Sequence, residues 1–239
     1  MAAAGAGLFG IWVGTFSLTP LASTGIAAAV MVLVTLTASR HLLPYGGDAG
    51  GKLLALPKGI VTFVGIIACI AFLVEGAIMD WGGVFLTTVR HFDMALAGTG
   101  FTVFSAAMLT MRLLGDWTVQ KLGQERVVIG GSLLAVAGFL FIIFAPTVVL
   151  LYLGFFFIGV GCANVVPVFF SLLGKQHVMP ISLAVPAVST LGYLGILMGP
   201  AAIGFIAHQT SLYAAFTLLA TLVLLQAVIA AYVYRHIVE

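Results

Sequence analysis

Glu75 is a carboxyl group inside a long apolar stretch of this chain, where acidic side chains are rare. A helix that begins at Gly59 reaches Glu75 after about 24 Å, within the outer third of an apolar layer. A carboxylate at that depth is costly, and low polarity disfavours its charged form. We therefore interpret Glu75 as a group that binds a proton or a solute. The alternative is a structural acid that is bonded to a neighbouring helix.

Three further polar residues are candidates for the same chemistry. Asp80 stands beside Trp81, as interfacial acids often do, and lies roughly 140° around a helix from Glu75, so the two should not share a face. Asn164 falls in the middle of an apolar run, shortly before Pro167. Its amide could bind a solute in a cavity or bond to a neighbouring backbone.

Tyr193 is a weaker candidate for facing a cavity. It stands among Gly192, Gly195 and Gly199, whose three- and four-residue spacing lets another helix approach closely. We therefore interpret these glycines as packing positions. Cys69 and Cys162 lie in apolar runs and are interpreted as small hydrophobic residues. No metal or cofactor site is predicted.

A charged segment between two apolar runs forms the second group of candidates. It spans residues 112–126 and includes Arg112, Gly115, Asp116, Lys121, Gly123 and Arg126. A carboxylate in such a turn can lie at a helix N-terminus, where nearby cations hold it. The segment is therefore interpreted as a latch of Asp116, Arg112 and Lys121. The alternative is an ordinary basic loop.

The elements that position these residues are predicted to be membrane-spanning helices. Hydrophobic residues make up 62% and charged residues 7% of the 239, against roughly 45–50% and 25% in soluble domains. Because a span needs about 20 apolar residues, the sequence predicts an all-α, polytopic transmembrane bundle, with no nucleic-acid-binding patch. Eight spans are expected, at about residues 2–18, 21–39, 59–80, 94–114, 127–145, 147–173, 181–207 and 211–234.

The basic residues assign an orientation to these spans. All but one of the nine Lys and Arg residues fall in segments that would share one side of the membrane, and the exception is Arg90. Since cytoplasmic loops retain Lys and Arg, the segments around Lys52, Lys121 and Lys175 and the C-terminus are predicted to be cytoplasmic.

The charged segment resembles the cytoplasmic loop motif of the major facilitator superfamily, in which Gly, acid, base, Gly and base follow at fixed spacing. Aligned on Lys121 and Gly123, the first Gly position holds Asp116 and the acid position holds Gln120. We interpret Asp116, which follows Gly115, as the substitute for the missing acid.

Two longer stretches extend the resemblance to the fucose-permease-like kind of bacterial facilitator. Residues 188–204, VSTLGYLGILMGPAAIG, resemble the penultimate helix of that kind, and residues 75–81, EGAIMDW, resemble the acidic end of its seventh helix. On this basis the chain covers about the last eight of twelve helices. Residues 1–39 would be part of helix five and helix six, 40–58 the cytoplasmic central linker, and 59–239 the C-terminal six-helix bundle.

The resemblance implies a proton-linked secondary transporter of a small solute in the bacterial inner membrane, with no cofactor. Its partners would be lipid, solute, protons and the absent N-terminal half. It also implies that the seventh and tenth helices line the cavity, which favours Glu75 and Asn164. The alternatives are a non-transporting scaffold and a half-transporter subunit that needs a partner. An intramembrane enzyme would need a paired nucleophile and base, and the sequence shows none.

Overall fold

The computed structural model describes residues 19–39 and 56–237, and every regular element in these ranges is helical. The predicted first span and most of the predicted linker lie outside the described residues. The elements are α2 (Pro20–Ser39), α3 (Ile60–Val84), the π-helix η1 (Phe85–Val89), η2 (Met94–Leu96), α4 (Thr99–Leu113), α5 (Gly115–Leu122), α6 (Gln124–Phe144), α7 (Val148–Cys162), α8 (Val165–Leu172), η3 (Leu173–Lys175), α9 (Ile181–Gln209) and α10 (Leu212–Ile237).

The chain divides into two units, residues 1–51 and 52–239. The helix α2 belongs to the first unit. Thr24–Ser39 of α2 form an apolar helix, and the spanning role predicted for residues 21–39 stays a prediction. In the second unit, six helical segments are long and apolar enough to cross a membrane, which confirms the predicted all-α transmembrane class. These six are Ile60–Val89, Met94–Leu113, Gln124–Phe144, Val148–Lys175, Ile181–Gln209 and Leu212–His236.

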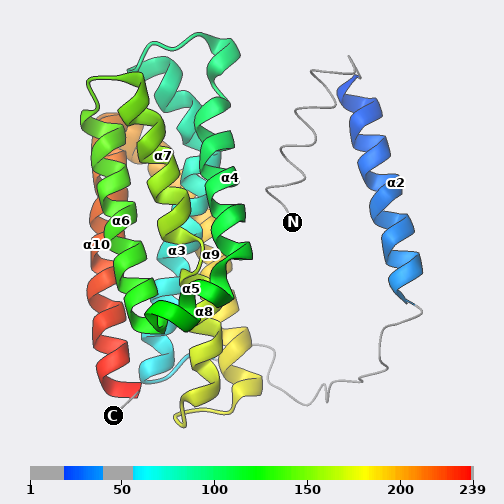
Figure 1. Ribbon diagram of the computed structural model, residues 1–239, viewed down its shortest axis with the longest axis vertical. Coiled ribbons are helices and arrows are strands. Elements are labelled where there is room, and N and C mark those ends of the chain that lie inside the picture. Colours follow the sequence, from blue (N-terminus) through cyan, green and yellow to red (C-terminus); the bar gives the residue numbers. More distant parts are fainter. Residues whose placement is uncertain (1–18, 40–55, 238–239) are drawn as a thin grey trace. The chain divides into compact units, whose positions relative to one another are not determined.

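The second unit is an elongated bundle in which long helices run side by side (Figure 1). α3 packs chiefly on α9, α6 packs on α7 and α10, and α4 packs on α7. Successive spans therefore place Lys58, Lys121, Lys175 and Arg235 at one end of the bundle. Arg90 follows η1 at the other end, where its guanidinium donates to the carbonyls of Ile142 and Ile143 near the end of α6.

The first span of the bundle is longer than the sequence analysis predicted. Instead of ending near Asp80, the helical path continues through η1 to Val89. The residues from Trp81 to Val89 carry no charge, and Phe85 and Leu86 are completely buried in the core, which explains the extension. Glu75 consequently lies near the middle of this helical segment and not in its outer third.

Near Pro167 the helical path breaks between α7 and α8, at Ala163 and Asn164. A proline has no N–H to give to the carbonyl four residues earlier, which here is Ala163. In contrast, α9 stays continuous through Pro186 and Pro200. The break also separates two buried clusters. One contains Val74, Phe139 and Ala163, and the other contains Val64, Val165 and Phe169.

Close approach between helices depends on glycine at several positions. A Cβ on Gly131 would lie 2.6 Å from the Gly161 carbonyl oxygen, and one on Gly138 would lie 2.6 Å from that of Gly154. On α9, Gly192, Gly195 and Gly199 face Phe72, the Cys69 carbonyl and Leu73 of α3, which confirms their packing role.

Two adjacent glycines of α6 give a matched test of this packing. Gly131→Ala should lower the thermal unfolding temperature of the purified chain in detergent, since overpacking costs about 1–3 kcal/mol. A Cβ on Gly130 would meet nothing within 4 Å. Gly130→Ala should therefore be neutral or stabilise by up to about 1 kcal/mol through helix propensity. Equal effects of the two changes would contradict the packing assigned to α6 and α7.

The orientation of the bundle is tested by cysteine labelling in intact cells. Lys121 and Gln209 lie at opposite ends of the bundle. Each is replaced singly by cysteine in a background in which Cys69 and Cys162 are changed to Ala. The cysteine at Gln209 should react with a membrane-impermeant reagent, and the one at Lys121 should react only after the cells are opened. Labelling at Lys121 in intact cells would show that the assigned orientation is wrong.

Candidate functional site

The centre of the candidate site is an ion pair between two helices. The Arg112 guanidinium, in the last turn of α4, donates from one terminal nitrogen to a Glu75 carboxylate oxygen at 3.0 Å. The Glu75 side chain, on α3, is 18% exposed, and that of Arg112 is 42% exposed. A largely buried carboxylate needs such a partner, because losing water is otherwise poorly compensated. The sequence analysis singled out both residues but did not pair them.

Arg112 also forms a hydrogen bond to the backbone at the break between α7 and α8. Its Nε donates to the Ala163 carbonyl at 3.3 Å, which is the carbonyl that Pro167 leaves without a helical N–H. One side chain therefore binds a charge on α3 and an orphan backbone acceptor on the broken helix. Ala163 is completely buried, so the pairing of its carbonyl with Arg112 stabilises the break.

Asn164 forms a second hydrogen bond between the break and α4, with the donor on the side of the break. It is 6% exposed, and its side-chain amide donates to the Met111 carbonyl in the last turn of α4 at 3.3 Å. A helix end leaves carbonyls unpaired, and this amide satisfies one of them. Of the two roles that the sequence left open, bonding to a neighbouring backbone is the one present in the structure. Asn164 nevertheless lies in the wall of a cavity.

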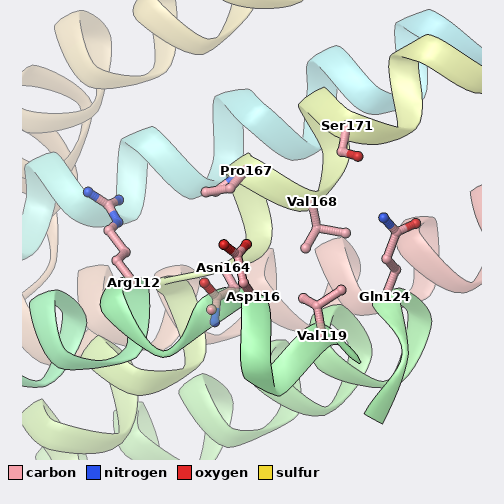
Figure 2. Close-up of a pocket in the computed structure, with 9 residues that line it drawn as sticks. Arg112, Asp116, Val119, Gln124, Asn164, Pro167, Val168 and Ser171 are labelled. Atoms are coloured by element: carbon pink, nitrogen blue, oxygen red, sulfur yellow. The ribbon is translucent and has the colours of Figure 1, made fainter. Parts of the chain in front are cut away.

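That cavity has a volume of about 290 Å³. Figure 2 shows its lining, to which the end of α4, the short helix α5, the start of α6 and the region from the break into α8 contribute. Asp116 comes from the first turn of α5 and has no hydrogen bond or ion pair to any described residue. The cavity lining therefore combines a guanidinium, a side-chain amide and an unpaired carboxylate with apolar side chains. The residues are Arg112, Gly115, Asp116, Val119, Gln124, Asn164, Pro167, Val168 and Ser171.

Glycines of the charged segment shape this wall. A Cβ on Gly115 would lie 2.6 Å from the Asn164 side-chain oxygen, so only glycine lets Asn164 approach here. Gly123 has a φ of 85° between α5 and α6, a conformation that favours glycine. Close packing at Gly115 and backbone conformation at Gly123 thus account for glycine at these positions without any latch.

Among the described residues, no hydrogen bond or ion pair joins Arg112, Asp116 and Lys121, the residues of the predicted latch. Arg112 pairs with Glu75, and the Lys121 ammonium lies 4.5 Å from the centroid of the Trp117 ring. Arg126 is exposed in the first turn of α6. A latch that involves Asp116 in another conformation stays a prediction.

The other two candidate residues lie apart from the ion pair. Asp80 is exposed and lines a separate cavity of about 350 Å³, together with Met94 of η2 and Phe101 of α4. Tyr193 is 62% exposed and stacks on Phe72 of α3, with 6.0 Å between ring centroids. Phe72 precedes Glu75 by one helical turn, so Tyr193 borders the helix face that carries Glu75.

Comparison with known proteins assigns the family. A model of the Major Facilitator Superfamily matches residues 64–238, and the chain belongs to this family. An uncharacterised MFS-type transporter of Yersinia pestis is 42% identical over 215 residues, which cover 90% of this chain and 55% of the relative. An uncharacterised transporter of Sinorhizobium fredii is 34% identical over 183 residues, which cover 77% of this chain and 48% of the relative. The predicted family, the major facilitator superfamily, is thereby confirmed.

A solved structure supports the fold. A peptide transporter (POT), crystallised in complex with sulfate, matches with a TM-score of 0.60 at 22% identity, over 82% of this chain and 41% of that chain. The chain spans about half the length of the curated relatives it matches.

The pairing of Arg112 is tested by two double-mutant cycles that share one variant. Combining Arg112→Gln with Glu75→Gln should give a coupling energy within the 0.5–3 kcal/mol range typical of residues in contact, measured by detergent-induced unfolding. Combining Arg112→Gln with Asp116→Asn should give additive effects. A larger coupling to Asp116 would mean that Arg112 belongs to the predicted latch and not to Glu75.

Proposed function

We propose that this chain is the C-terminal part of a proton-linked secondary transporter that moves a small solute across the bacterial inner membrane. The observation that carries the proposal is the ion pair of Glu75, in the middle of an apolar helical segment, with Arg112 in the last turn of α4. Ionisable groups at that depth are rare and usually belong to a solute or proton pathway. The bacterial origin of the matched relatives supports the inner membrane.

In the proposed mechanism, Glu75 is the group that gains and loses the proton. As a carboxylate it accepts the Arg112 hydrogen bond; when a proton binds, the carboxyl becomes neutral while Arg112 keeps its charge. The attraction between α3 and α4 then weakens. Because Arg112 also holds the Ala163 carbonyl, this change reaches the break between α7 and α8, where the cavity wall lies.

The solute is proposed to contact the cavity lined by Arg112, Asp116 and Asn164. This donor and acceptor set suits a small polar molecule that carries both kinds of group. Secondary transporters of this kind bind their solutes between two halves that rock against each other. We therefore propose that an N-terminal half completes the site. Exposed apolar residues of α9, such as Leu197, Met198 and Phe205, are candidates for covering by that half.

The functional test of Glu75 uses residues 1–239 joined to the N-terminal helices of a full-length family member. Glu75→Gln keeps the shape of the side chain but cannot bind and release a proton. It should abolish proton-driven uphill accumulation in proteoliposomes and preserve solute exchange. Undiminished uphill uptake would remove Glu75 from proton coupling.

A matched acidic control is available at the other end of the bundle. Asp93 accepts a hydrogen bond from the Ala95 amide at the start of η2, and Asn retains that acceptor. Asp93→Asn should therefore leave uphill uptake unchanged. If Glu75→Gln and Asn164→Ala together also leave uptake and exchange unchanged, the proposed site is wrong.

A further inference from the structure

A third cavity lies at the end of the bundle where α6 begins and α10 ends. Its volume is about 510 Å³. The positive-inside pattern assigns this end to the cytoplasm. The residues that line it come from α5, α6, η3 and α10, and are Val119, Gly123, Gln124, Glu125, Lys175, Tyr234 and Arg235. Val119 and Gln124 also line the proposed solute cavity, whereas Lys175, Tyr234 and Arg235 do not.

Charge in this cavity favours an anion. Lys175 and Arg235 bring two exposed cations from different elements, and Glu125 brings one exposed acid. The cavity also contains the N-terminus of α6, a helix of 21 residues whose preceding Gly123 supplies no side-chain cap. Unpaired N–H groups and the helix dipole favour negative charge at such an end. Lys175 is held nearby, with its ammonium 3.5 Å from the Gln124 side-chain oxygen.

The independent sign of a ligand is Tyr234. This residue lines the cavity, is only 6% exposed, and has a hydroxyl group without a hydrogen-bond partner among the described residues. Buried hydroxyl groups in native proteins are normally paired, because an unpaired one loses its bonds to water without replacement. Its ring is held in place beside Phe169, with 6.0 Å between ring centroids. A hydrogen-bond acceptor bound in the cavity would supply the partner that this hydroxyl lacks.

We propose that this cavity binds a phosphate group, with Lys175 and Arg235 as its cations, the first amides of α6 as backbone donors and the Tyr234 hydroxyl as a side-chain donor. Phosphate oxygens accept several charge-assisted hydrogen bonds at once, which this donor set supplies. The cavity lies at the cytoplasmic ends of membrane helices, where basic pockets bind anionic lipid headgroups. The phosphate can thus come from an anionic phospholipid or from a free phosphate ester.

Calorimetric titration of the purified chain in detergent distinguishes these sources. The probes are dioctanoylphosphatidylglycerol, dioctanoylphosphatidylcholine and inorganic phosphate. Binding of phosphatidylglycerol alone identifies a lipid headgroup as the source, while binding of inorganic phosphate as well identifies a site for the phosphate group itself. Both results support the proposal. Failure of both anions to bind, or equal affinity for phosphatidylcholine, would overturn it.

Matched variants locate the binding. Lys175→Gln with Arg235→Gln should weaken anion binding by about tenfold or more. Lys58→Gln with Arg126→Gln removes the same charge from the same end of the bundle without touching the cavity lining and should change affinity by less than about twofold. Equal losses in the two pairs would mean that the anion binds through diffuse charge only, and the proposed cavity would be wrong.

Tyr234→Phe provides a second test of the site if the variant with Lys175→Gln and Arg235→Gln fails to fold. It removes only a hydroxyl that no described residue bonds, so the unfolding temperature without ligand should be unchanged or higher. Anion affinity should fall severalfold. Unchanged affinity for the anion in Tyr234→Phe would remove the hydroxyl from the site and overturn the proposal as stated.

Discussion

The Arg112 side chain is the contact on which the rest of the candidate site depends. It joins the Glu75 carboxylate of α3 to the Ala163 carbonyl at the break between α7 and α8. In water each of these acceptors would be satisfied by solvent. Inside a bilayer an unpaired carboxylate and an unpaired carbonyl are both costly. A guanidinium can serve both because its donors are arranged in a rigid planar fork.

The break between α7 and α8 places Asn164 in the wall of the 290 Å³ cavity. Pro167 removes the donor for the Ala163 carbonyl, and the chain turns at Ala163 and Asn164 before α8 begins. Asn164 then reaches the Met111 carbonyl, while Arg112, the next residue, reaches back to Ala163. The end of α4 and the broken helix are thus tied by two reciprocal side-chain bonds. Non-helical backbone at membrane depth is tolerated where such partners exist.

Sequence reasoning predicted the helical transmembrane class because the apolar runs are long and their charges are few. It also identified Glu75 and Asn164, since polar side chains in such runs stand out. It assigned Arg112 to a loop motif instead of the ion pair. The reason is physical: spacing along the chain does not show how far α4 descends beside α3, and that depth decides which acid Arg112 meets. It also ended the first span of the bundle too early, near Asp80, because the burial of Phe85 and Leu86 depends on tertiary packing. The position of Pro167 was the available sign that the Ala163 carbonyl would need another donor.

The most direct measurement of the central interaction is a solid-state NMR distance in lipid bilayers. The chain would carry ¹⁵N in arginine and ¹³C in the carboxyl carbon of glutamate. Among the described residues, Glu75 and Arg112 form the only Lys or Arg ion pair with a carboxylate. The structure predicts strong dipolar recoupling between the guanidinium nitrogen and the carboxyl carbon, abolished by Arg112→Gln. Absence of that recoupling in the unmodified chain, or its persistence in Arg112→Gln, would contradict the pairing of Glu75 with Arg112.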